Sequence, residues 1–93
     1  MKLTRIDASH PLFEASFTLY EASFPPNERR MREDHLRALQ DADFSPLGAV
    51  EDGMLLADVF LWETEDFCYL EHFAVQPSLR GHGTGSTILR QLL

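Results

Sequence analysis

The sequence contains little cysteine, few basic residues and no long apolar run. Its 93 residues include a single cysteine, Cys68, which cannot form a disulfide within the chain. Lysine and arginine total 8 against 15 aspartates and glutamates, giving a formal net charge of -7. No apolar run approaches the roughly 18 residues of a membrane span, because Asp58 interrupts the longest one, within residues 54–62. These shortages argue against a disulfide scaffold, a sequence-independent nucleic-acid binder and a membrane-spanning protein.

The bulk composition is that of an ordinary globular protein. Hydrophobic residues make up 44% of the chain and charged residues 25%, so we expect a single small domain over residues 1–93. The N-terminal sequence, MKLTRIDASH, has no apolar segment typical of a signal peptide. Together with the lone cysteine, which fits a reducing compartment, this predicts a cytoplasmic protein. The acidic charge also favours cationic partners such as amines.

Hydrophobic periodicity predicts the element order β-α-α-β-β-β-α. Phe13, Phe17, Tyr20 and Phe24 recur at the spacing of one helix face, and Asp52-Gly53 is typical of a hairpin turn. The predicted elements are a strand over 2–6, helices over 10–24 and 28–40, strands over 47–51, 54–63 and 67–75, and a helix over 84–93. The pattern therefore indicates an α/β (α+β) fold with a mainly antiparallel sheet.

The end of the chain lacks the features of a finished fold. The strand expected over 67–75 is apolar on both faces and interrupted only by Glu71 and His72, as in strands inside a sheet. No segment after the last predicted helix can pair with the far side of this strand. The helix itself ends on Leu92-Leu93 without a cap. We therefore expect a chain cut short of a complete domain.

Gly81, Gly83 and Gly85 occupy alternate positions between this strand and the last helix. Glycines let backbone N–H groups form a concave nest, and the first turn of the following helix adds free N–H groups and a favourable dipole. Arg80 stands at the rim, where its guanidinium could pair with phosphate oxygens. No lysine follows the glycines as a P-loop requires, and their spacing does not fit the dinucleotide-binding fingerprint. The pattern predicts an anion site in which bound phosphate is the leading candidate.

The stretch VQPSLRGHGTGS resembles the acyl-coenzyme A motif of the GNAT N-acetyltransferase superfamily, Q/R-x-x-G-x-G/A. Arg80, Gly83 and Gly85 fill its three fixed positions. The predicted element order resembles the first two-thirds of the family fold, and LYEASFPPNERR resembles the first-helix region of bacterial members. The resemblance implies a GNAT-like acyl-CoA N-acyltransferase fold that lacks the last strands and helix.

This resemblance implies transfer of an acetyl group from acetyl-CoA, as co-substrate, to a primary amine whose identity stays open. In the family the loop amides hold the coenzyme pyrophosphate, and the exposed edge of the preceding strand pairs with the pantetheine arm. The coenzyme-binding residues implied are Phe73, Ala74, Val75, Arg80, Gly81, His82, Gly83, Thr84, Gly85 and Ser86.

The resemblance also implies roles in the chemical step. A strand amide near Phe73 would stabilise the oxyanion, and Glu71 is the candidate general base. We expect Glu71 on the same strand face as Phe73 and Tyr69, because the three alternate along the strand. The general acid, often a tyrosine in the family, is expected beyond Leu93.

Two other functions stay open from the sequence. One is a non-catalytic module that binds acyl-CoA or dimerises, or an inactive fragment of such an enzyme; the other is a structural domain whose glycine loop binds an incidental anion. The unpaired strand edge predicts a homodimer.

Several polar and reactive residues are expected to have structural roles. The histidines and Cys68 show no metal-ligand spacing, so no metal site is expected, and Cys68 is predicted to be buried. Arg29, Arg30 and Arg32 are predicted to lie on a solvated helix face.

Overall fold

A computed structural model describes residues 1–92 and confirms the predicted order of helices and strands. Leu93, expected at the end of the last helix, lies outside the described residues. The elements are β1 (Lys2–Arg5), α1 (Phe13–Ser23), the 3-10 turn η1 (Pro26–Glu28), α2 (Arg32–Ala38), β2 (Phe44–Glu51), β3 (Met54–Glu63), β4 (Cys68–Val75), the 3-10 turn η2 (Pro77–Leu79) and α3 (Thr84–Leu92).

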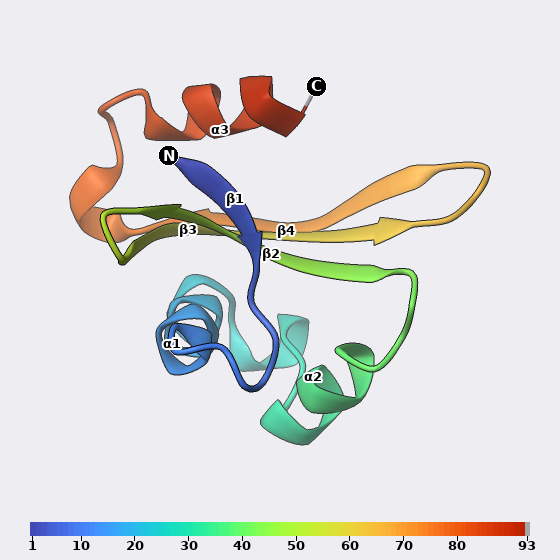
Figure 1. The fold of residues 1–93 in the computed structure, drawn as a ribbon. Coiled ribbons are helices and arrows are strands. Elements are labelled where there is room, and N and C mark those ends of the chain that lie inside the picture. The colour runs from blue at the N-terminus through green and yellow to red at the C-terminus, as the bar shows by residue number, and fades with distance from the viewer. Residues whose placement is uncertain (93) are drawn as a thin grey trace.

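The described strands form one antiparallel sheet between two helical layers. The strand order is β1-β2-β3-β4, so β4 lies at an edge and, within residues 1–92, pairs with β3 alone. Figure 1 shows α1 and α2 against one face of the sheet and α3 against the other. The predicted antiparallel sheet is confirmed, whereas the homodimer through the β4 edge stays a prediction.

An aromatic core fills the space between the sheet and the helices α1 and α2. The predicted stripe of α1 supplies Phe13, Phe17 and Tyr20, which pack with Phe44 of β2 and Phe60 of β3. Tyr20, Phe44 and Phe60 have no exposed surface. On the opposite face, Ile88 of α3 is fully buried against small and branched residues of the sheet, namely Ala49, Ala57, Val59 and Leu61.

Helices α1 and α2 both begin later than the sequence predicts. Pro11 lies in the expected first turn of α1, and the Leu12 N–H donates to the ring Nδ1 of His10 at 3.0 Å, so a turn precedes the helix. The backbone of Arg29 and of Met31 is extended, with φ/ψ of -123°/154° and -66°/158°, which prevents a helix from starting at Glu28. These local contacts override the helical pattern of the sequence.

Strand β2 begins at Phe44, three residues before the predicted start at Leu47. Pro46 argues against a strand in sequence, because proline cannot donate to a ladder. The carbonyl oxygen of Pro46 accepts from the Ile6 N–H at 2.9 Å, so the backbone of Pro46 faces the β1 side of the strand. Strand β1 ends at Arg5, and the N–H that proline lacks would have pointed to this side. No bond to β3 is lost, and Phe44 reaches the aromatic core.

Strand β4 begins at Cys68, and the prediction that Cys68 is buried is wrong. Its side chain is exposed, because the β3–β4 hairpin projects past the helices (Figure 1). Phe67, Tyr69 and Leu70 beside it are exposed as well.

Candidate functional site

The outer edge of β4 carries the strand residues that the sequence predicts for coenzyme binding. The Gln76 N–H donates to the Leu56 carbonyl at 2.9 Å, so the backbone of Gln76 faces β3. Because antiparallel ladders alternate, Ala74 faces β3 too, and Phe73 and Val75 direct their N–H and C=O groups to the open edge. Of the three predicted strand residues, two therefore present backbone groups to a ligand, and the third does not.

The loop from Arg80 to Gly83 leads from this edge to α3. Gly81 and Gly83 have φ angles of +84° and +78°, in the left-handed region that favours glycine. A Cβ atom at either position would meet nothing within 4 Å, so the conformation, and not crowding by the protein, explains the two glycines. A Cβ at Gly85 would lie 3.6 Å from the Phe73 ring and 3.7 Å from the Val75 side chain, which is ordinary contact.

The backbone N–H groups from Gly81 to Ser86 have no carbonyl acceptor among residues 1–92. The N–H of Arg80 reaches the Pro77 carbonyl at a long 3.4 Å, and the next bonded donor is the Thr87 N–H, which contacts the Gly83 carbonyl at 3.1 Å. Arg80 to Gly83 and Ser86 are exposed. The loop therefore offers a run of free donors at the positive end of a helix dipole, an arrangement that suits a phosphate or another anion.

The Arg80 side chain links this loop to the strand edge. Its Nε donates to the Val75 carbonyl at 3.1 Å, which confirms that this carbonyl points away from β3. The two Nη groups of the guanidinium form no bond within the described residues. Arg80 thus combines an anchor on β4 with a cationic end free to pair with an anion.

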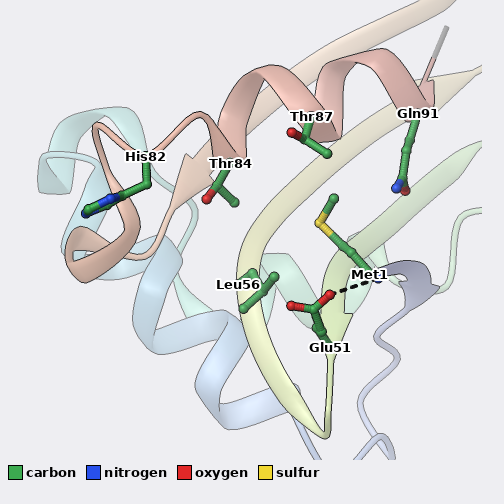
Figure 2. A pocket seen from close by; sticks show the side chains of 7 residues that line it. All are labelled: Met1, Glu51, Leu56, His82, Thr84, Thr87 and Gln91. Atoms are coloured by element: carbon green, nitrogen blue, oxygen red, sulfur yellow. Dashed lines mark hydrogen bonds and ion pairs between the residues drawn. The ribbon is translucent and has the colours of Figure 1, made fainter.

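A cavity of about 340 Å³ lies beside the loop on the flank of α3 that faces the N-terminus. Figure 2 shows side chains of α3, including Thr84, Thr87 and Gln91, across this cavity from Met1 and Glu51. The Met1 ammonium pairs with the Glu51 carboxylate at 3.1 Å, so these two charges offset one another. His82 and Thr84 are the predicted coenzyme-binding residues that line it.

A β-bulge corrects the expected orientation of Glu71. Phe60 of β3 pairs with His72 and Leu61 pairs with Leu70, so Glu71 is an extra residue in β4. The bulge places Glu71 and His72 together on the face that α1 and α2 cover, while Phe73 packs near Gly85 of α3 on the other face. The prediction that Glu71 and Phe73 share a face is therefore wrong.

The Glu71 carboxylate is held by two donors in a partly buried cluster. Its Oε1 forms an ion pair with an Nη of Arg30, and its Oε2 accepts from the indole N–H of Trp62. The ring Nε2 of His72 lies 3.3 Å from Oε1. The prediction that Arg30 lies on a solvated helix face is also wrong, because only 20% of its side chain is exposed.

Two histidines face this cluster from different elements. Burial, and after it the charge of the nearby Arg30 guanidinium, lower the pKa of His35 in α2 to about 4. Burial also lowers the pKa of His72, with Glu71 opposing the shift. Because both pKa values are lowered, both rings are neutral near pH 7. The His35 ring centroid lies 5.6 Å from that of Tyr20, so His35 packs as an aromatic neighbour of the ion pair.

Asp58 of β3 is a second buried carboxyl group, opposite Ala74 of β4. Its Oδ1 accepts from the Ser16 hydroxyl at 2.6 Å, and its Oδ2 has no partner within the described residues. Burial raises the pKa of Asp58 to about 7, and the bond from Ser16 only partly opposes this shift. Asp58 is therefore a buried acid without a cationic partner among residues 1–92.

Arg30, Trp62 and His35 are site residues that sequence reasoning missed. One signal was available: two adjacent polar residues, Glu71 and His72, in an otherwise apolar strand break the alternation of sides and indicate a bulge. No sequence pattern pairs Arg30 with Glu71, which lies 41 residues away.

Neither a metal centre nor a membrane-crossing helix is found in the part of the chain that the structure describes. No group of three or more histidine, cysteine, aspartate or glutamate side chains there could hold a metal ion. None of the helices over residues 1–92 has the length and apolar character needed to cross a membrane.

Comparison with known proteins identifies relatives of this fold. The sequence pattern of the Acetyltransferase (GNAT) family matches residues 9–93. None of the curated proteins matches the chain in sequence. Among solved structures, a protein from Bacteroides thetaiotaomicron that is assigned to the GNAT family as an acetyltransferase is 28% identical, with a TM-score of 0.91. The alignment covers 99% of this chain and 53% of that one.

Two more distant structures share the fold. The ribosomal-protein-S18-alanine N-acetyltransferase from Escherichia coli is 16% identical with a TM-score of 0.75, covering 98% of this chain and 56% of that one. An aminoglycoside 6'-N-acetyltransferase complexed with coenzyme A is 15% identical with a TM-score of 0.74, covering 99% and 53%. The chain thus spans about half the length of each of these relatives.

Proposed function

This chain belongs to the GNAT acetyltransferase family, and we propose that it binds acetyl-CoA for transfer of the acetyl group to a primary amine. The observation that carries the proposal is the run of backbone N–H groups from Gly81 to Ser86 without carbonyl acceptors in residues 1–92. A diphosphate has enough oxygens to accept from several of these donors at once. The exposed residues of the loop, Arg80 to Gly83 and Ser86, leave room for it.

Two segments of the coenzyme have complementary groups on the chain, the pyrophosphate and the pantetheine arm. The loop amides and the free end of Arg80 would bind the pyrophosphate. The pantetheine arm would lie along the open edge of β4, where Phe73 and Val75 offer N–H and C=O groups to its two amides. This arrangement directs the thioester from the loop toward the bulge at Glu71.

The chemical step needs a donor for developing negative charge and a base. The acetyl thioester supplies the electrophilic carbonyl carbon. The Phe73 N–H, at the open edge, would donate to the carbonyl oxygen, and such a donor contributes about 3–4 kcal/mol to transition-state stabilisation in other enzymes. Glu71 is the nearest carboxylate along β4 and would take the proton that the amine must lose before it attacks. The amide C–N bond would form as the C–S bond of the thioester breaks, and coenzyme A would leave as its thiolate.

Replacing Gly83 with alanine is expected to weaken acetyl-CoA binding by about tenfold or more. Alanine at a φ of +78° costs roughly 1–2 kcal/mol, so the loop would relax away from the conformation that aligns its amides. Isothermal titration calorimetry of the 93-residue chain with acetyl-CoA measures the change.

Gly85→Ala is the matched control for this substitution. Its new Cβ makes ordinary contacts with Phe73 and Val75, and we expect an affinity within about twofold of the original. If the unsubstituted chain, folded by circular dichroism, binds no acetyl-CoA, the proposal is wrong. Equal loss of affinity in both variants would show that the loop conformation is not what binds the ligand.

A non-catalytic acyl-CoA-binding module uses the same loop and is the second candidate. The observation that favours it is the ion pair of Glu71 with Arg30, which leaves the candidate base already engaged. Release of free coenzyme A thiol in the presence of amines separates the two functions. Binding without amine-dependent release would assign the chain to the second.

A further inference from the structure

The Arg30 guanidinium occupies a site formed by a carboxylate and aromatic rings. One Nη pairs with Glu71, and the other lies 3.2 Å from the ring Nδ1 of His35. The guanidinium carbon lies 5.6 Å from the Tyr20 ring centroid and 5.1 Å from that of Phe44. A negative charge beside two aromatic rings is a suitable environment for a cation.

Arginine fills this site imperfectly. The Nε of Arg30 is buried and has no hydrogen-bond partner among the described residues, which is costly for a charged group. Arg30 also lies in the extended segment between η1 and α2, and its own N–H donates to the Tyr20 hydroxyl at 2.5 Å. The side chain is thus attached to a non-helical connection, so it can leave the site without unwinding a helix.

The site lies close to where the acyl group is expected. Glu71 is the bulge residue of β4 and precedes Phe73, the start of the open edge, by two positions. The bulge turns the Glu71 side chain toward α1 and α2, away from the face that α3 covers. The proposed coenzyme path runs along the open edge of β4 and ends with the acyl group near Glu71. A ligand that reached Glu71 from the side of α1 and α2 would therefore lie next to the acyl group.

We propose that the Glu71 site binds the ammonium group of the acceptor amine, and that Arg30 occupies this site until the acceptor displaces it. The identity of the cation as the acceptor rests on the proposed function, but its binding at Glu71 does not. A primary ammonium is compact, has three donors and no buried N–H corresponding to the arginine Nε. The formal charge of -7 favours the approach of such a cation.

Trp62 provides a direct readout of the site. It is the only tryptophan in the chain, and its indole N–H donates to the Glu71 carboxylate. The indole resonance in a 15N-labelled sample can therefore be followed during titration with n-butylammonium chloride at constant ionic strength, without any coenzyme. Titration with n-butanol tests for binding of the alkyl chain alone.

The midpoint of the titration is the n-butylammonium concentration at which the Trp62 indole resonance has moved by half of its total shift. Arg30→Gln is expected to lower this midpoint about tenfold, because the competing side chain is removed. Arg32→Gln is the matched control: it removes the same charge two residues away, where Arg32 pairs with the exposed Glu14. That variant should titrate like the unsubstituted chain. Arg30→Lys, which keeps a competing cation, should lie between the two.

Three results would overturn the inference: equal titration curves for Arg30→Gln and the unsubstituted chain, an equal response to n-butanol, or a shift that persists in Glu71→Gln. Should Arg30→Gln fail to fold, the response of the unsubstituted chain at high butylammonium and its loss in Glu71→Gln decide the question. Because the titration contains no coenzyme, failure of acetyl-CoA binding would refute the proposed function and leave this site standing.

Discussion

Replacing Asp58 with asparagine is expected to raise the free energy of unfolding at pH 8 by about 2–4 kcal/mol and to change it little at pH 4. Asp58 is 1% exposed, and the structure provides no cation beside it. Asparagine has nearly the same shape and keeps an oxygen for the Ser16 hydroxyl, which Asp58 binds at 2.6 Å. The variant removes the ionisation and leaves the packing intact.

The sign of the effect follows from the pKa of Asp58 in the two states. Burial raises the pKa to about 7 in the folded protein from the ordinary 3.8 of an aspartate. Between these values the unfolded chain releases the proton and the folded chain retains it, so the contribution of Asp58 to stability falls as the pH rises from 3.8 to 7. Urea unfolding from pH 4 to pH 8 measures this slope.

The buried His35 and the partly buried His72 act in the opposite direction over an overlapping pH range. His35, with a pKa lowered to about 4, contributes stability that is lost as the pH falls below 6.5. The overall pH profile of the protein therefore mixes both effects, and the difference between Asp58→Asn and the unsubstituted chain isolates the carboxyl group. Asp66→Asn, at an exposed turn, is the control and should give no such difference. Parallel profiles for Asp58→Asn and the unsubstituted chain would contradict the account.

Phe60→Ala is expected to lower the free energy of unfolding by about 3–5 kcal/mol, a large part of the stability of a domain this small. Phe60 has 0% exposure and lies at the centre of the aromatic core. Its ring centroid lies 5.5 Å from that of Tyr20, 5.2 Å from His35 and 5.8 Å from Phe44. Truncation leaves a cavity among rigid rings, which cannot collapse to fill it.

Phe67→Ala makes the same chemical change at an exposed position. Phe67 is 60% exposed before β4, so we expect a loss of less than about 0.5 kcal/mol. Denaturant unfolding of both variants at pH 7 gives the comparison. Similar losses in the two variants would mean that the core does not lie where the structure places it.

The sequence predicts the parts of this fold that depend on local patterns. The aromatic stripe of α1, the Asp52-Gly53 turn and the glycines before α3 each have a period or a backbone requirement that can be recognised without coordinates. The same holds for the free amides of the loop, since a run of glycines at a helix start leaves N–H groups without partners.

What the sequence could not predict depends on contacts between distant segments. The extended backbone around Arg30 runs against a helical pattern, and its N–H is bonded to the Tyr20 hydroxyl at 2.5 Å. The bulge at Glu71 shifts every later residue of β4 to the other face, which a strict alternation cannot anticipate. Both errors concern the cluster of Arg30 and Glu71, so this cluster was the least predictable part of the described structure.

The amide resonances of residues 81–86 test the account most directly. Coenzyme A, added to a 15N-labelled sample of the 93-residue chain, should shift these resonances and slow their exchange with solvent, because the diphosphate would accept from their N–H groups. Pantetheine, which lacks the diphosphate, should affect the backbone of Phe73 and Val75 and leave the loop unchanged. Loop resonances that stay unchanged at saturating coenzyme A would contradict the account.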